Sequence, residues 1–93
     1  MTTQHTPGPW SIDWNFIVAP DPSGKHADVY IAEIAESDED GRIPSEDQIE
    51  ANARLIAAAP DMLAALQHVL ARATMPGFLR DEVKAAIARA TVA

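Results

Sequence analysis

The sequence predicts an α+β protein, with a small antiparallel sheet of two to three strands packed against two to three C-terminal helices. Apolar and polar side chains alternate over Trp10–Ala19, and a second strand pattern covers Asp28–Ala35. From Ser45 onward, apolar residues recur at helical spacing instead. Strands joined by a connection this short pair antiparallel, so a strand meander followed by helices is expected.

The first strand pattern allows two interpretations. In a single strand, the large apolar side chains of this segment share one face: Trp10, Ile12, Trp14, Phe16 and Val18. The polar segment Asp13–Asn15 can instead divide it into two short strands, and both versions stay open. Pro20–Gly24 has the composition of a loop.

Capping and proline signals place the first two helices. Ser45 and Gln48 have the spacing of a capping box, which opens a helix. Pro60 cannot lie in a helix interior without losing a hydrogen bond and clashing with the preceding turn. We therefore expect a break near residues 58–59, with Pro60 as the first residue of a second helix.

Met75–Gly77 interrupts the helical pattern again, and a last helix is expected from about Phe78 to Ala90. The predicted core combines the apolar faces of strands and helices: Trp10, Ile12, Phe16, Val18, Ile31, Ile56, Leu63, Leu66, Leu70, Val83 and Ile87.

The chain is too short to build two hydrophobic cores, so residues 1–93 are expected to form a single domain. Its expected parts are an extended arm over 1–9, strands over 10–36, an acidic loop over 37–44 and helices over 45–92. Since the helices carry wide, alanine-rich apolar faces, a homodimer is a further expectation.

Composition excludes several classes of protein. The formal net charge of −7 argues against direct binding to nucleic acid or to an anionic membrane. The absence of cysteine excludes disulfides, zinc–thiolate sites and thiol nucleophiles. The N-terminus has no secretory signal pattern, and Pro60 and Asp61 interrupt the most apolar stretch. We expect a soluble, cytoplasmic protein.

Charge is concentrated in one part of the chain. Residues 1–50 hold eleven acidic and two basic side chains, a net −9, and residues 51–93 hold three and five, a net +2. The acidic tract from Asp28 to Glu50 has nine carboxylates against Arg42. Such a tract is either a solvated surface or a surface that docks on a basic groove in place of nucleic-acid phosphates. In the docking interpretation, eight residues contact the partner: Glu33, Glu36, Asp38, Glu39, Asp40, Glu46, Asp47 and Glu50.

Residues that commonly perform chemistry do not form a recognisable site. The segment Ser37–Gly41 offers oxygen ligands but lacks the spacing of a calcium loop. His5, His26 and His68 are scattered over three segments, and no serine lies in a nucleophile-elbow pattern. We therefore expect no catalytic residue, no cofactor and no metal ligand.

Three aromatic side chains near the N-terminus also allow two interpretations. Trp10, Trp14 and Phe16 on one strand face would form a base-stacking platform if basic residues surrounded them. The first fifty residues hold only Lys25 and Arg42 as bases, so we expect the rings to lie in the core. Trp10 is also expected to hold the N-terminal arm in place.

Two strings of residues resemble a family of small phage and prophage proteins. His5–Trp10 reads HTPGPW, and Glu50–Leu66 reads EANARLIAAAPDMLAAL; together they cover 23 of 93 residues. Family members open with an HTPGPW-like string and reach an EANARLIAAAPELLEAL-like helix after short strands. Asp61 and Met62 replace the glutamate and leucine that are common there. The resemblance implies a phage or prophage gene product that acts in the cytoplasm of the bacterial host, and it supplies no catalytic residue.

The leading functional prediction is a non-catalytic phage accessory protein that binds and modulates a bacterial host protein or complex. Its most concrete form is an anti-defence inhibitor that uses the acidic surface as a nucleic-acid mimic. One alternative is a self-assembling structural or assembly component of the phage. Another alternative is a small enzyme or a metal-dependent regulator.

Overall fold

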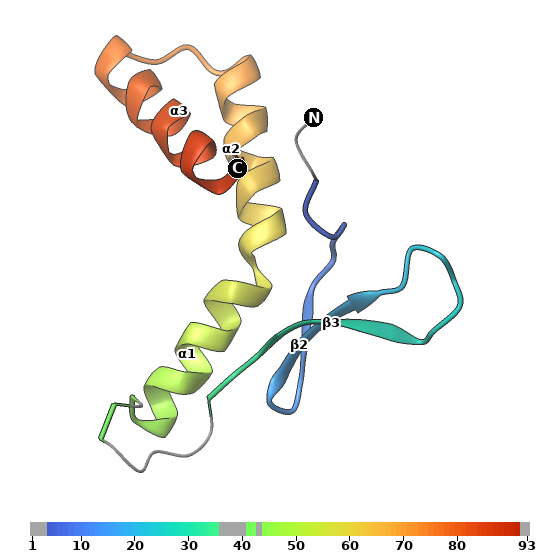
Figure 1. Ribbon diagram of the computed structural model, residues 1–93. Coiled ribbons are helices and arrows are strands. Elements are labelled where there is room, and N and C mark those ends of the chain that lie inside the picture. The colour runs from blue at the N-terminus through green and yellow to red at the C-terminus, as the bar shows by residue number, and fades with distance from the viewer. Residues whose placement is uncertain (1–3, 36–40, 43, 92–93) are drawn as a thin grey trace. The chain divides into compact units, whose positions relative to one another are not determined.

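The computed structural model describes residues 4–35, 41–42 and 44–91 (Figure 1). The chain divides into two compact units, and each is treated by itself. The sheet unit is Thr6–Pro60, and the helical unit is Asp61–Ala93 together with Met1–His5. The expectation of a single domain over residues 1–93 stays a prediction.

The three strands and three helices of the described residues confirm the α+β prediction. Strands β1 (Ser11–Asp13), β2 (Phe16–Pro20) and β3 (Asp28–Glu33) form one antiparallel sheet in the order β1-β2-β3. The Trp10–Ala19 pattern is therefore two short strands, which turn at Trp14 and Asn15. The strands precede the helices in the chain, as expected.

The turn at Trp14 makes the single-face prediction for the first segment wrong. Ile12 pairs with Ile17, and Asp13 pairs with Phe16. Since directly paired residues share a face, Ile12 lies with Ile17, whereas Phe16 lies on the opposite face. Ile17, absent from the predicted core, is fully buried. A hairpin reverses the alternation, so period-two counting fails across it.

The predicted core is correct in part. Val18 and Leu63 are buried, whereas Ile12 and Ile56 are 44% and 37% exposed and do not belong to it. Ala19 and Ala53 are buried although they were not predicted to be. The other predicted core residues are half-buried: Trp10, Phe16, Ile31, Leu66, Leu70, Val83 and Ile87. Ile12 is open because it lines a groove between the hairpin and the first helix.

The first helix begins where the capping box predicts. In α1 (Glu46–Ala57), the Ser45 hydroxyl accepts a hydrogen bond from the Gln48 N–H at 3.4 Å, and the Ser45 N–H donates to Gln48 Oε1 at 3.2 Å. Only Ala58 separates α1 from α2 (Ala59–Arg72). Pro60 is the second residue of α2, one position from its predicted place, and the expected break is confirmed.

The N-terminal arm folds against this helix junction. The Trp10 indole N–H donates to the Thr6 carbonyl at 3.0 Å, which holds the arm in a tight loop as expected. A Cβ placed on Gly8 would lie 3.2 Å from Pro60 Cβ, so glycine allows the arm to approach the proline ring. The HTPGPW string and the helical string therefore meet at Gly8 and Pro60.

The loop between β2 and β3 is organised by one carboxylate. Asp21 Oδ1 accepts hydrogen bonds from the Ser23 N–H at 3.0 Å and the Ser23 hydroxyl at 2.9 Å, and Oδ2 accepts from the His26 N–H at 2.9 Å. The Ser23 backbone N–H, then its hydroxyl, lower the pKa of Asp21 by stabilising the charged form. The loop predicted at Pro20–Gly24 is thus an aspartate-centred turn.

The helical unit contains most of α2 and all of α3 (Gly77–Thr91). Leu63 is buried in α2, and α3 has no buried residue. Arg80 connects the two helices, since its guanidinium donates to the Leu70 carbonyl at 3.3 Å and to the Ala73 carbonyl at 3.3 Å. Among the described residues, no helix has the length and hydrophobicity to cross a membrane.

Candidate functional site

The carboxylates predicted to contact a partner fall on two elements of the sheet unit. Glu33 ends β3, and Glu46, Asp47 and Glu50 occupy the first turns of α1; all four are exposed. The other four predicted contact residues lie outside the described residues: Glu36, Asp38, Glu39 and Asp40. Glu46 and Asp47 lie in the first turn of α1, where the positive end of the helix dipole stabilises their negative charge.

Among the described residues, one of these carboxylates takes part in an ion pair. One ion pair occurs among residues 4–35, 41–42 and 44–91, between Arg54 Nη1 and Glu50 Oε2 at 4.0 Å on α1. Both side chains are largely exposed, so the pair contributes no more than a few tenths of a kcal/mol. The other described residues of the predicted contact set, Glu33, Glu46 and Asp47, are exposed to solvent.

The division of charge follows the division into units. The sheet unit holds eleven acidic and three basic side chains, a net −8, and the helical unit holds three and four, a net +1. Exposed charges within about a Debye length of one another, ~8 Å at physiological salt, add to a common potential. The sheet unit is therefore the electronegative part of the protein.

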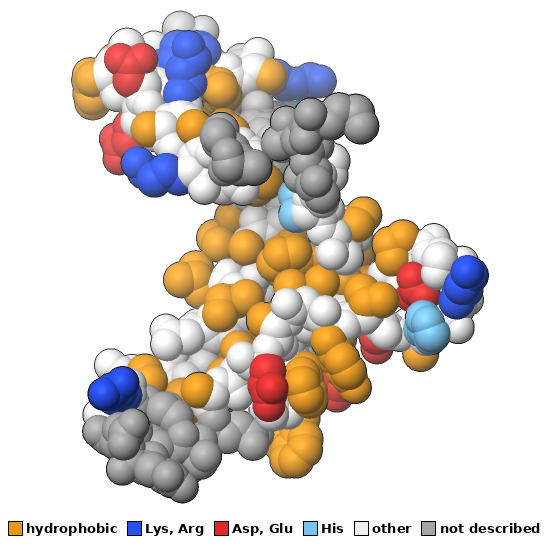
Figure 2. Space-filling view, in the orientation of Figure 1, with side chains coloured by type: hydrophobic (Ala, Val, Ile, Leu, Met, Phe, Trp, Pro, Cys, Tyr) orange, Lys and Arg blue, Asp and Glu red, His pale blue; other side chains and the backbone are white. Residues whose placement is uncertain are grey.

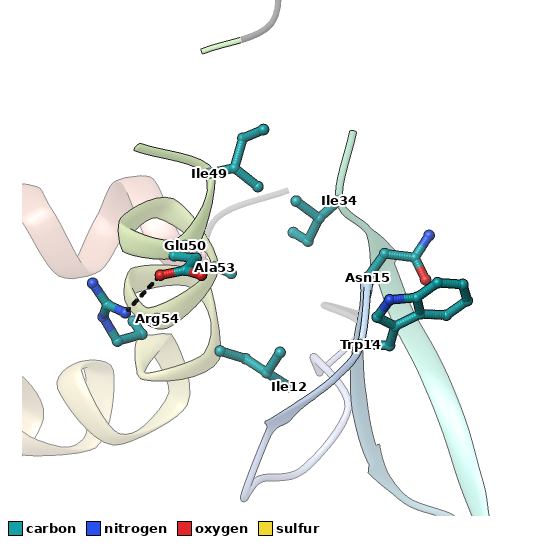
Figure 3. Close-up of a pocket in the computed structure, with 8 residues that line it drawn as sticks. All are labelled: Ile12, Trp14, Asn15, Ile34, Ile49, Glu50, Ala53 and Arg54. Carbon is teal, nitrogen blue, oxygen red and sulfur yellow. Dashed lines mark ion pairs between the residues drawn. The ribbon is translucent and has the colours of Figure 1, made fainter. Parts of the chain in front are cut away.

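An open groove lies within the sheet unit, between the β1–β2 hairpin and α1 (Figure 3). This hairpin groove has a volume of about 420 Å³. Its lining is mainly apolar: Ile12, Trp14, Asn15, Ile34, Ile49, Glu50, Ala53 and Arg54. In Figure 3, Ile12 of the hairpin and Ile34, which follows β3, extend toward the helix that carries Ile49.

Trp14 occupies the tip of the hairpin. The residue has a φ of 57°, the left-handed region that favours glycine, and its side chain is 85% exposed. A positive φ at the first of two loop residues is typical of a type II′ hairpin turn. The expectation that Trp14 lies in the core is wrong, because the turn projects the ring away from the sheet.

Asn15 completes the turn and carries an unsatisfied acceptor. Its carbonyl accepts a hydrogen bond from the Ile34 N–H at 2.7 Å, which extends the pairing of β2 and β3. Its side-chain Oδ1 is buried and accepts no hydrogen bond in the described part of the chain. Buried amide oxygens normally have a partner, so this atom marks a locally unoptimised position.

The three aromatic rings considered as a base-stacking platform do not lie together. Phe16 stacks on Tyr30 instead, with 4.5 Å between ring centroids and an interplanar angle of 26°. Trp10 is half-buried in the arm, whereas Trp14 lies at the hairpin tip. Figure 2 shows that many hydrophobic side chains remain on the surface. The large ones are Ile12, Trp14, Tyr30, Leu55 and Ile56 in the sheet unit and Met62, Val69, Phe78 and Leu79 in the helical unit.

The described residues contain no cluster of metal-ligating side chains, and their histidines lie on separate segments. No group of three His, Cys, Asp or Glu side chains there is arranged to hold a metal ion. His5 lies in the arm, His26 in the β2–β3 loop and His68 on α2. Of the segment considered for calcium, only Gly41 is described.

The sheet, the helices that follow it and the exposed carboxylates define a small acidic α+β protein. The family model for Salmonella phage P22 protein Y8K6 matches residues 1–93, and the chain belongs to this phage protein family. The expected phage relationship is thereby confirmed. No curated protein and no solved structure matches the chain.

Proposed function

We propose that this phage protein acts without catalysis, by binding a bacterial host protein through the sheet unit and modulating it. The observation that carries the proposal is the concentration of charge, a net −8 on a unit whose described carboxylates form one weak ion pair. Such a surface accelerates encounter with a basic partner and disfavours acidic ones. A defence complex or another nucleic-acid-handling complex, with its basic groove, is the partner class that this charge suits.

The experiment is affinity capture from a nuclease-treated bacterial lysate, followed by binding measurements with the purified partner. A variant with Glu36, Asp38, Glu39 and Asp40 replaced by lysine is expected to lose binding while its circular dichroism is unchanged. Binding by the wild-type chain should weaken steeply as salt rises. Replacing Asp81 and Glu82 of α3 by lysine is the matched control, which should leave binding intact. Undiminished binding by the first variant would refute the proposal.

A second candidate is self-assembly through the helical unit. The described residues of this unit include one buried side chain, Leu63, and expose Met62, Val69, Phe78 and Leu79. Its net charge of +1 allows two copies to approach without the repulsion expected between sheet units. Sedimentation of the wild-type chain and of Phe78→Ser tests this candidate. A concentration-independent monomer would exclude it.

A further inference from the structure

The backbone at Trp14 is held in an unfavourable conformation. A bulky side chain at a φ of 57° costs free energy that glycine would not incur. Packing of the side chain recovers little of that cost, because the residue is 85% exposed. Folding alone therefore favours glycine at this position. An aromatic ring kept in solvent at a cost is typical of an anchor for another molecule.

The neighbouring residue shows a second departure from good folding. Asn15 Oδ1 is buried without a hydrogen bond from any described residue. Strained backbone and unsatisfied polar atoms concentrate at functional positions, where binding compensates for what folding loses. Two such costs at adjacent residues single out the hairpin tip.

The hairpin groove beside this tip offers apolar surface to a ligand. Three isoleucines line the groove (Figure 3). Ile12 of β1 is 44% exposed, Ile34 directly follows β3, and Ile49 lies on α1. A volume of about 420 Å³ accommodates large apolar side chains. Burial of such side chains would remove apolar surface from water on both molecules.

Charge around the groove restricts what the ligand can be. Glu50 lines it and is held by Arg54 only at 4.0 Å in solvent, so an incoming cation can compete for the carboxylate. Asp13 precedes Trp14, and Glu33 precedes Ile34; both acids are exposed. Nucleic acid would be repelled by this surface, and so would the sheet unit of a second copy.

We infer that the hairpin groove is the docking site for the protein partner, and that it receives an apolar side chain from a basic segment of that partner, with Trp14 as the anchor. The inference rests on the proposed function, because it locates the contact that the acidic unit makes. The proposed function defines the contact surface by its negative charge, and this inference adds the apolar groove and Trp14 to that surface.

The probe is a displayed library of random short peptides, from which binders are selected with the full-length protein as the target. Selected peptides are expected to share an aromatic or aliphatic residue flanked by lysine or arginine. The variant W14G should weaken their binding by at least about tenfold, as loss of an interface anchor does. Ile12→Ser, which changes the groove and leaves the turn intact, should weaken it as well. Methyl NMR shifts on binding should centre on Ile12, Ile34 and Ile49.

Leu55→Ser is the matched control, since Leu55 is an exposed apolar residue of α1, with 61% exposure, that does not line the hairpin groove. It should leave peptide binding unchanged. Absence of a basic, apolar consensus, or equal binding by wild type and W14G, would overturn the inference. Dimerisation that W14G abolishes would also overturn it, because the occupant would then be a second copy. A host partner that binds W14G normally but not the lysine-substituted acidic variant would leave the proposed function standing and reject the groove.

Discussion

Among the described residues, the sheet unit buries Ile17, Val18, Ala19 and Ala53, whereas the helical unit buries only Leu63. In the sheet unit, α1 lies against β1 and β2, and paired strands bring apolar residues into one layer. In the helical unit, an arginine bonds to the carbonyls at the end of α2. The sheet unit also carries the excess negative charge. The sheet unit thus combines a core with an electronegative surface, whereas the helical unit combines partly buried apolar side chains with the Arg80 hydrogen bonds.

The largest expected effect comes from a substitution in the core of the sheet unit. Ile17→Ala should lower the free energy of unfolding by about 3 kcal/mol, because a fully buried side chain is lost and a cavity remains. Both tryptophans lie in this unit, so fluorescence during urea denaturation reports on it directly. Ile12→Ala, at a half-exposed position, is the control and should cost less than half as much. Equal losses would show that Ile17 has no special place in the core.

The second prediction concerns the polar contact of the helical unit. Arg80→Met keeps the apolar stem but removes both bonds to the Leu70 and Ala73 carbonyls, and should destabilise α3 by about 1.5 kcal/mol. Hydrogen exchange of the α3 amides should accelerate, while tryptophan fluorescence stays unchanged. Arg89→Met, at an exposed arginine of the same helix, is the control. Unchanged exchange in the Arg80 variant would mean that apolar packing alone holds α3.

The third prediction tests the contact between the two family strings. Gly8→Ala should cost about 1 kcal/mol, since its Cβ would lie 3.2 Å from the Pro60 ring. Adding Pro60→Ala should recover part of that loss, which a double-mutant cycle measures as a coupling energy. Gly77→Ala provides the control, because nothing lies within 4 Å of its added methyl. Additive losses would show that Gly8 and Pro60 are not coupled.

Local signals made several of these features predictable from the sequence. The capping box at Ser45 and the break before Pro60 follow from chemistry within one helical turn. The hairpin at Trp14 was predicted only as one of two possibilities, because tryptophan gives no signal for a positive φ. The acidic tract was visible as composition, whereas the groove depends on α1 lying beside the hairpin. Patterns in the sequence report on neighbouring residues, so they do not predict contacts between segments that are far apart in the chain.

The fourth prediction removes the strain at the hairpin tip. Trp14→Gly should raise the free energy of unfolding by about 0.5–1 kcal/mol, as relief of the positive φ exceeds the added freedom of the unfolded glycine. Trp14→Ala is the control, because alanine remains strained at this φ and should give no such gain. Thermal and urea denaturation followed by circular dichroism measure both variants. Equal stabilisation by alanine would place the cost in the exposed ring instead of the backbone.

The smallest expected effect concerns the Asp21 turn. This turn belongs to the sheet unit but not to its core, because its hydrogen bonds are exposed to solvent. Hydrogen bonds from Ser23, first from its N–H, lower the pKa of Asp21 in the folded state. Its contribution is therefore present above the usual aspartate pKa and lost as the pH falls through the lowered value. Carboxyl NMR should show Asp21 titrating below the usual aspartate pKa, and the Ser23 and His26 amide shifts should follow the same midpoint. In Asp21→Asn that shared midpoint should disappear. An Asp21 that titrates at the usual aspartate pKa would show that the hydrogen bonds of the turn do not stabilise its charged form, and would remove the turn as a source of acid sensitivity in the sheet unit.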